Sequence, residues 1–358
     1  MGKDYEDIHR NNVEIYAKQI AAVFDSAVKE GASIGALTSG LFNPDKPFSF
    51  ADYPITKVRF NKLTKSLVSG IEKVVLNGID HEWTLSNNKN SELSRMVFGD
   101  NIGKLSKEQE ERYFSNNHKA RDTFKARKTD GLGLSTRVWK YSEGFKEQLE
   151  AGIDIGLRDR LSASDMARDI KQYLVDPDRL YRRVRDIHGN LQLSKAAKAF
   201  HPGQGVYRSS VRNAQRLART ETNMAYRTAD YERWQQLDFV VGIEVYRSNK
   251  GFECPTCNSL KGKYPKDFKF TGWHTQCMCS ARTILKTAKE MKADNERMLR
   301  GEPLSGESKN SISDVNKGFS TWIKKNTERI NKGSSVPYFI RDNYVDGKIS
   351  KGLKFASI

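Results

Sequence analysis

This chain of 358 residues is 37% hydrophobic and 29% charged, proportions typical of a globular protein with a well-solvated surface. Its 61 Lys and Arg residues outnumber 44 Asp and Glu, and the formal net charge of +17 favours a polyanionic partner, with nucleic acid as the first candidate and an acidic protein surface as the second. No apolar run approaches the roughly 20 residues needed to cross a bilayer, and the N-terminus lacks the basic-then-apolar layout of a signal peptide. We therefore expect two or three domains, a reducing cytoplasm and no membrane partner.

The first half of the chain is predicted to be helical, because apolar residues recur every three to four positions. Four helices are predicted. The first spans residues 5–30, the second starts at Pro54 and the third starts at a cap on Ser135. The fourth runs from a capping box at Ser162 to the residue before Pro177. Gly31 is expected to break the first of them. Residues 88–131 are rich in Asn, Ser and Lys and predict shorter helices joined by exposed turns.

A short hairpin is predicted at residues 182–193, followed by a long helix over about residues 209–237. Glu221 falls in the apolar stripe of that helix. A carboxylate at a core-facing position needs a partner, because an unpaired buried charge costs several kcal/mol. We interpret Arg219, Thr220 and Glu221 as a structural polar core, in which Glu221 meets a group from another element, rather than as catalytic residues.

The last third of the chain predicts a small sheet and a tail. Residues 239–246 form the best strand pattern, and residues 280–285 are interpreted as the returning strand. A charged helix at 289–299 and a linker at 301–313 follow, and the short tail after them must dock on the body or on a partner. These patterns predict an α+β fold, predominantly α-helical, with a small β-sheet that carries a Cys/His site.

All four cysteines lie within 26 positions, and a histidine lies among them. The five residues are Cys254, Cys257, His274, Cys277 and Cys279. Two thiolates in a tight turn, completed by a second pair from a distant loop, are typical of structural zinc. We predict one zinc per chain, held by the first three residues plus Cys277 or Cys279. Residues two apart in a strand face opposite sides, so both should not be ligands unless the backbone turns there. A pair of disulfides is the alternative. No catalytic residue is assigned, because the acids nearest this motif have no recognisable spacing to it.

Basic residues are concentrated between residues 178 and 219, where ten of them accompany two acids. The residues predicted to contact nucleic acid are Arg179, Arg182, Arg183, Arg185, Arg208, Arg212 and Arg216. The last three, together with Arg219, recur at three-to-four spacing and so form one ridge on the long helix. Such a ridge suits phosphate-backbone contact without sequence reading, and a solvated face with local salt bridges is the alternative.

The segments Arg219-Thr220-Glu221, Cys254-x2-Cys257, a turn containing Gly262 and His274-x2-Cys277-x-Cys279 together resemble the Mu F-like head morphogenesis (minor capsid) family of tailed phages and prophages. The resemblance covers roughly residues 205–285. The helical N-terminal part, with residues 78–83 after its long helix, is similar to longer members from phages and prophages of gut Bacteroidetes. The family usually ends its motif His-Pro-x-Cys-Arg-Cys. Thr275 and Met278 stand at the proline and arginine positions, so the metal site is retained, whereas a phosphate contact by that arginine is not carried over.

With the predicted elements, the resemblance implies a helical N-terminal region at 1–158, a Mu F-like core with the Cys/His knuckle at 159–287, and a linker with a short tail unit at 288–358. It implies a minor head protein, with portal and other capsid proteins and non-specific double-stranded DNA as partners, in the host cytoplasm during assembly and then in the virion head. We expect no enzymatic activity. The alternative is a zinc-supported nuclease or a transferase-type effector delivered with the virion, and the nuclease would need His201 and Glu221 to converge near a second metal.

Overall fold

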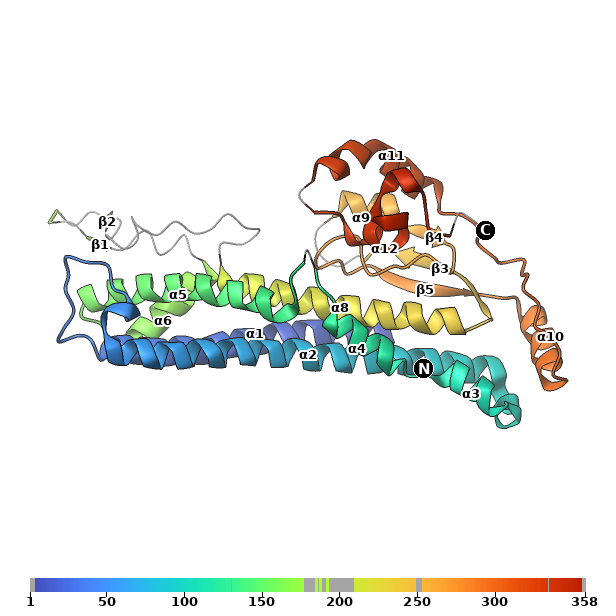
Figure 1. The fold of residues 1–358 in the computed structure, drawn as a ribbon, viewed down its shortest axis with the longest axis horizontal. Helices are drawn as coiled ribbons and strands as arrows, with labels where there is room; N and C mark the ends of the chain where they lie inside the picture. Colours follow the sequence, from blue (N-terminus) through green and yellow to red (C-terminus); the bar gives the residue numbers. More distant parts are fainter. Residues whose placement is uncertain are drawn as a thin grey trace. The chain divides into compact units, whose positions relative to one another are not determined.

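The structure is a computed structural model that describes residues 4–129, 131–176, 184–185, 187–188, 191–192, 209–248, 253–333 and 335–355 (Figure 1). It is mainly helical with one small three-stranded antiparallel sheet and a Cys/His cluster beside it, which confirms the predicted α+β class. Within these residues, no helix is both long enough and apolar enough to span a membrane.

The chain divides into two compact units, each assembled from separated stretches. The bundle unit comprises Glu14–Asn77 and Ala126–Arg219, and the sheet unit comprises Met1–Val13, Gly78–Lys125 and Thr220–Ile358. The domain boundaries predicted after residues 158 and 287 fall inside these units rather than between them. The difference arises because three long helices each contribute residues to both units, so no single cut in the sequence separates them.

The bundle unit is built from helices. They are α1 (Tyr5–Ala36), α2 (Pro54–Phe98), α5 (Leu134–Arg158), α6 (Ala163–Val175) and α8 (Ser210–Gln236), with the 3-10 turn η1 (Phe50–Asp52) before α2. Only the bundle unit's part of α1, α2 and α8 belongs here. Their buried faces carry the apolar residues of the three-to-four pattern, among them Phe24, Leu67 and Leu149. Hydrophobic periodicity therefore located the helices of this unit.

The glycines of α1 are sites of close packing rather than breaks. A Cβ added to Gly31 would lie 2.5 Å from a Leu149 methyl carbon, and one added to Gly35 would lie 2.7 Å from Ile153. Only glycine allows α1 and α5 to approach this closely. The helix therefore continues through both positions to Ala36, and the break predicted at Gly31 is wrong.

Three other local predictions for this unit had different outcomes. The cap predicted on Ser135 is wrong, because α5 begins one residue earlier, with Gly133 as a cap that provides no side-chain hydrogen bond. Ser162 does cap α6, since its hydroxyl accepts the backbone N–H of Asp165. The predicted hairpin is present as β1 (Val184–Arg185) paired antiparallel with β2 (Leu191–Gln192).

In the sheet unit, α2 continues to Phe98, so the short helices predicted from residue 88 begin only after it. Several polar residues around this point, Ser86, Asn90 and Ser94, are buried partners rather than turn formers. The Ser86 hydroxyl and the Asn90 amide donate to the Asp230 carboxylate at 2.7 and 3.0 Å. The shorter elements that follow are η2 (Gly99–Lys104), α3 (Lys107–Phe114) and α4 (His118–Ala126).

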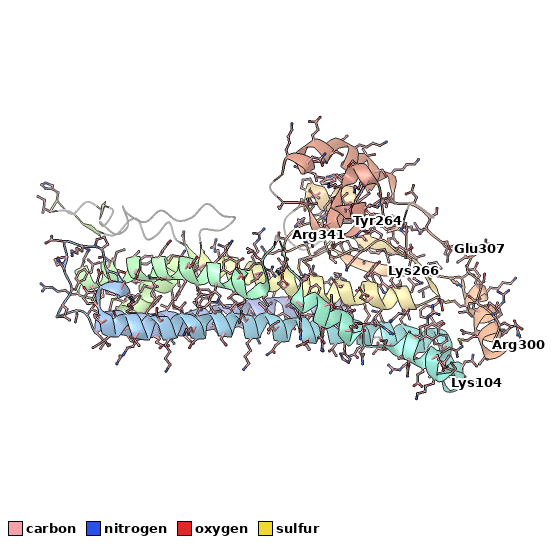
Figure 2. The ribbon with its side chains drawn as sticks, viewed as in Figure 1. Lys104, Tyr264, Lys266, Arg300, Glu307 and Arg341 are labelled. Carbon is pink, nitrogen blue, oxygen red and sulfur yellow. The ribbon has the colours of Figure 1, made fainter. Side chains whose placement is uncertain are left out.

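The three-stranded sheet has the order β4-β3-β5, with all neighbours antiparallel. Its strands are β3 (Val240–Tyr246), β4 (Gly262–Tyr264) and β5 (Ser280–Leu285), and its helices are α9 (Pro255–Leu260), α10 (Ala288–Leu299), α11 (Lys317–Lys332) and α12 (Tyr338–Asn343). Two short turns, η4 (Val345–Gly347) and η5 (Ile349–Lys351), follow. Lys266, after β4, donates to the carbonyl of Leu237 at 3.0 Å and so joins the sheet to the end of α8 (Figure 2).

Aromatic side chains bind the tail to the sheet. Tyr264, Phe268 and Trp273 are at most 2% exposed and contact the equally buried Phe319 of α11, and Trp273 also contacts Phe339 of α12. The predicted linker also touches the sheet, because the N–H of Ile312 donates to the carbonyl of Val241 at 3.3 Å. The tail is therefore part of one core with the sheet.

Candidate metal centre

The first two cysteines lie at the start of α9, directly after the loop that leaves β3. Cys254 is the N-cap of this helix, and Pro255 occupies its first turn, where proline removes no helical hydrogen bond. The Cys254 sulfur accepts the backbone N–H of Cys257 at 3.5 Å, so the turn places both sulfurs on the same side. A Cys-x2-Cys turn of this kind is typical of one half of a structural metal site.

His274 completes a three-residue cluster with them. Its Nε2 atom lies 3.2 Å from the Cys254 sulfur and 3.1 Å from the Cys257 sulfur. Its Nδ1 atom lies 2.9 Å from the carbonyl oxygen of Thr275. Because a carbonyl can only accept, Nδ1 carries the proton, and the Nε2 lone pair of the neutral ring is directed toward the two sulfurs. An outer hydrogen bond of this kind fixes the tautomer that binds a metal.

Cys277 and Cys279 form a second group of sulfurs with Cys257. The Cys257 and Cys277 sulfurs are 4.0 Å apart, and the three sulfurs of this second group all lie within 4.8 Å of one another. Both cysteines therefore face the site. This is the exception that the prediction allowed if the backbone turns there, because residues 277–279 precede β5 and follow a tight turn closed by the N–H of Cys277 on the carbonyl of His274.

The backbone of this loop needs its glycine. Gly272 has a φ of +115°, and a Cβ placed there would lie 3.1 Å from the Cβ of Cys277. Gln276 also has a positive φ of 59°, in the left-handed region. These two conformations fold residues 272–279 back on themselves, which brings His274 and both cysteines to one place.

The distance between the sulfurs of Cys257 and Cys277 fits two ligands of one metal ion better than a disulfide. A tetrahedral zinc with bonds of about 2.3 Å to sulfur separates its sulfur ligands by roughly 3.8 Å, close to the 4.0 Å between Cys257 and Cys277. A disulfide requires about 2.05 Å, and all four cysteines are free thiols in this structure. The cluster therefore has the donor types and distances to hold a metal ion.

Crowding of the sulfurs changes their acidity. The hydrogen bond with the Cys277 sulfur raises the pKa of Cys257, and the same contact lowers the pKa of Cys277. Burial acts against ionisation of Cys254, but the N–H of Cys257 lowers the pKa of that thiol overall. Neighbouring thiolates repel one another, so the group cannot ionise fully without a compensating positive charge. A divalent cation supplies that charge.

The cluster is buried on one side and open on the other. Cys257, Cys277 and Cys279 are at most 4% exposed and belong to the aromatic core of the sheet unit, whereas Cys254 is half-buried and His274 is exposed. Metal binding at this position would fasten the 253–260 turn to the 271–279 loop across the end of the sheet.

The three residues of the predicted polar core, Arg219, Thr220 and Glu221, do not share one environment. Glu221 is 2% exposed, as expected for a residue in the apolar stripe of α8, and Thr220 is half-buried. Arg219 points elsewhere and forms a two-point ion pair with Glu14 of α1, at 3.0 and 2.9 Å.

The predicted basic ridge is described only in part. Arg212 is exposed and Arg216 half-buried on α8, and the backbone of Arg185 lies in β1. Arg219 is neutralised by Glu14. The side chain of Arg185, and the whole of Arg179, Arg182, Arg183, Arg208 and His201, lie outside the described residues.

The sequence analysis missed a buried polar network in the sheet unit. His9 is 1% exposed; its Nδ1 lies 2.5 Å from the Glu82 carboxylate and its Nε2 lies 3.0 Å from the Asn223 amide oxygen. Nearby, the buried guanidinium of Arg227 binds the Glu6 carboxylate at 2.9 and 2.6 Å. The sequence carried no clear signal for this network, because the burial of residues 221–230 of α8 is known only from the structure.

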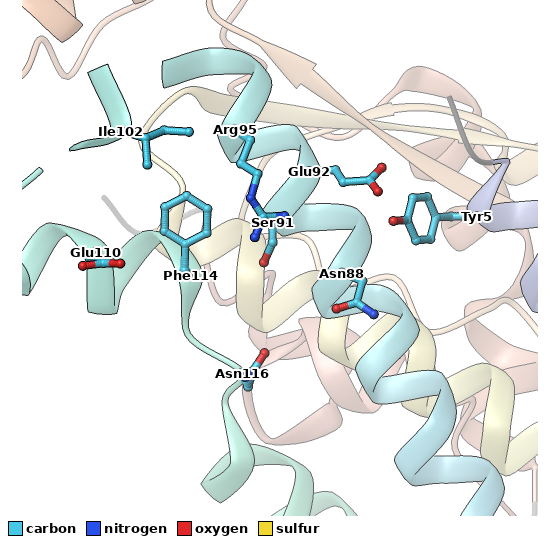
Figure 3. A pocket seen from close by; sticks show the side chains of 9 residues that line it. All are labelled: Tyr5, Asn88, Ser91, Glu92, Arg95, Ile102, Glu110, Phe114 and Asn116. Carbon is cyan, nitrogen blue, oxygen red and sulfur yellow. The ribbon is translucent and has the colours of Figure 1, made fainter. Parts of the chain in front are cut away.

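A polar groove of about 460 Å³ also lies in the sheet unit, between the last turns of α2 and the η2–α3 segment (Figure 3). Arg95 extends into it, 5.6 Å from the centre of the Phe114 ring. At one end, burial and a hydrogen bond to the Glu92 carboxylate raise the pKa of Tyr5 to about 12. Arg95 thus stacks on Phe114, and Tyr5 pairs with Glu92, inside the groove.

Comparison with protein families, curated proteins and solved structures found no match to this chain.

Proposed function

We propose that this protein is a structural, DNA-contacting minor head protein of a tailed phage or prophage, stabilised by one zinc ion. The observation that carries the proposal is the convergence of Cys254, Cys257, His274, Cys277 and Cys279 at one end of the sheet. The order and spacing of these ligands are those by which the sequence resembles the Mu F-like family.

The structural part of the proposal rests on where the cluster lies. Three of its sulfurs are buried in the aromatic core, and the metal would join the short helix α9 to the 271–279 loop, which has no regular secondary structure. Free energy of metal binding at such a place is folding free energy. Zinc suits the donor set, since sulfur and imidazole ligands in a tetrahedral arrangement are its preferred environment. We assign the centre no catalytic role.

The head-protein part rests on the resemblance and on the charge. A net charge of +17, together with the exposed Arg212 on α8, favours contact with a polyanion such as packaged DNA. Portal and other capsid proteins are the protein partners that the resemblance implies.

Two measurements test the two parts separately. Elemental analysis of the purified protein should find about one zinc per chain, with thiols that become alkylated only after chelation. If the protein contained no metal and no free thiols, the cysteines would be assigned to disulfides instead of a zinc site. Mass spectrometry of purified virions should find the protein in the particle, and its absence there would remove the head assignment while leaving the metal centre intact.

A further inference from the structure

The first half of α2 presents an exposed basic face in the bundle unit. Its members are Arg59, Lys62, Lys65 and Lys73, and all four side chains are exposed. In a helix with 3.6 residues per turn, these positions fall within one third of the circumference. The opposite face of the helix is buried through Phe60, Leu63, Leu67, Ile71 and Val75, so the four cations point away from the core. We call Arg59, Lys62, Lys65 and Lys73 the α2 basic face.

No nearby acid neutralises this face. The sequence from Pro54 to Ile71 contains no Asp or Glu, and the first acid of the helix, Glu72, is half-buried. Within the described part of the chain, none of the four residues forms an ion pair. Arg219 in the same unit differs, because Glu14 neutralises it. The α2 basic face therefore keeps its full positive charge at the surface.

The groups between the cations are donors of hydrogen bonds rather than apolar anchors. Asn61, Ser66 and Ser69 are exposed on or beside the same face. A stable protein interface usually has an apolar centre, whereas a phosphate backbone is bound by cations together with hydroxyl and amide donors. Exposed apolar residues occur at one end only, as Ile55 and Val58.

The length of the face also fits a duplex. From Arg59 to Lys73 the helix rises about 21 Å, at 1.5 Å per residue. Double-stranded DNA carries one charge per roughly 1.7 Å, so about twelve phosphates pass along that length. Four long, flexible side chains can each reach one of them, and nothing in the face reads bases.

We propose that the α2 basic face binds the phosphate backbone of double-stranded DNA without sequence preference. Only the choice of DNA as the polyanion rests on the proposed function, since the surface itself is defined by charge and exposure. It is separate from the arginines of residues 179–216, which the sequence analysis selected.

The test compares matched variants of the full-length protein. Lys62→Gln/Lys65→Gln removes two charges from the face. Lys146→Gln/Lys171→Gln removes two partly exposed charges from the same unit that are paired with carboxylates, Lys146 with Glu150 at 4.0 Å and Lys171 with Asp25 at 2.6 Å. Glutamine and lysine have similar helix propensity, so both variants should fold, which circular dichroism checks. Affinity for a short duplex of arbitrary sequence is measured by fluorescence anisotropy at several salt concentrations.

In the first variant, the slope of log affinity against log salt should flatten by about 1.8, at roughly 0.9 for each phosphate that the two lysines neutralise in the wild type. The Lys146/Lys171 variant should match the wild type. A slope unchanged by the Lys62/Lys65 substitutions would overturn the proposal, as would equal effects of the two variants. Competition by polyglutamate as strong as that by DNA at equal charge would assign the face to an acidic protein instead.

A third variant, Arg212→Gln/Arg216→Gln, separates this proposal from the predicted arginine ridge. If it alone weakens binding, DNA contact stands and the α2 assignment fails. If the wild type binds no DNA even at low salt, both surfaces lose their assignment, whereas the zinc content and the virion measurement are unaffected.

Discussion

Cys257 should be the one cysteine that the metal centre cannot lose. It is the only residue shared by the two groups of donors, one with Cys254 and His274 and the other with Cys277 and Cys279. Replacing Cys257 by alanine leaves four donors as two pairs, Cys254 with His274 and Cys277 with Cys279, with no donor common to both groups. Replacing Cys279 also leaves four donors, enough for a tetrahedral site, and keeps Cys257 within 4.8 Å of each of the other three. We therefore expect Cys257→Ala to abolish zinc binding, and Cys279→Ala to retain about one zinc per chain.

The expected magnitude follows from burial and mass action. Cys257 is 4% exposed, and its replacement by alanine removes a single buried sulfur. Loss of one small buried group costs about 1 kcal/mol. The metal contributes far more, about 4 kcal/mol when free zinc is at 1,000 times its dissociation constant. With zinc present, the stability of Cys257→Ala should therefore fall by about 5 kcal/mol, and after chelation by only about 1 kcal/mol.

Urea unfolding of the wild type and both variants, with zinc and with a chelator, measures these differences. Hydrogen exchange of residues 253–260 and 271–279 shows whether the loss is local to the two segments that the metal joins. If Cys257→Ala and Cys279→Ala lose stability equally, or if chelation leaves the wild type unchanged, the shared-ligand geometry does not hold a metal and the reasoning is refuted.

Three further outcomes are expected. Glu221→Gln should lower the free energy of unfolding by about 1–3 kcal/mol in thermal melts, because an amide replaces one carboxylate oxygen and the buried group loses hydrogen bonds that this oxygen accepts. An unchanged melting temperature would contradict a structural role. Gly31→Ala should lower the free energy of unfolding by about 1–3 kcal/mol, because its Cβ would lie 2.5 Å from Leu149 and overpack the core. Gly144→Ala in α5, which has open space around it, should raise the free energy of unfolding by up to about 1 kcal/mol. Similar effects at both sites would refute close packing of α1 on α5. Hydrogen bonds from a serine hydroxyl and two backbone N–H groups lower the pKa of Glu290 from 4.5 to about 2, so its anchoring of residues 308–309 should be present above pH 4.5 and lost as the pH falls through 2. Proteolysis of the 301–313 segment by pepsin should follow that window, and Glu290→Gln should remove the pH dependence.

The metal centre shows how far local sequence reasoning reaches. The identity of its five donors was available from their clustering alone, because cysteines and a histidine at such spacing are typical of a metal site. The orientation of Cys277 and Cys279 was not available. It depends on the left-handed backbone at Gln276 and on a turn before β5, and the rule that alternate residues face opposite sides applies only inside a strand.

The errors elsewhere in the fold have the same origin. Gly31 has the composition of a helix break, but in the folded chain it is the point where α5 packs against α1. The Asn and Ser residues of α2 have the composition of turns, but Asp230 of α8, 140 residues later in the chain, satisfies Asn90 inside the core.

The sequence by itself determined where most helices and strands lie, since amphipathic periodicity is imposed by each element's own buried face. It also determined the metal donors and the excess of positive charge. Only the tertiary structure decided which polar residues are buried, which glycines allow close approach, and how separated stretches combine into two units. The physical reason is that a polar or small residue carries no signal of its own environment. Its role depends on the partner that a distant part of the chain brings to it.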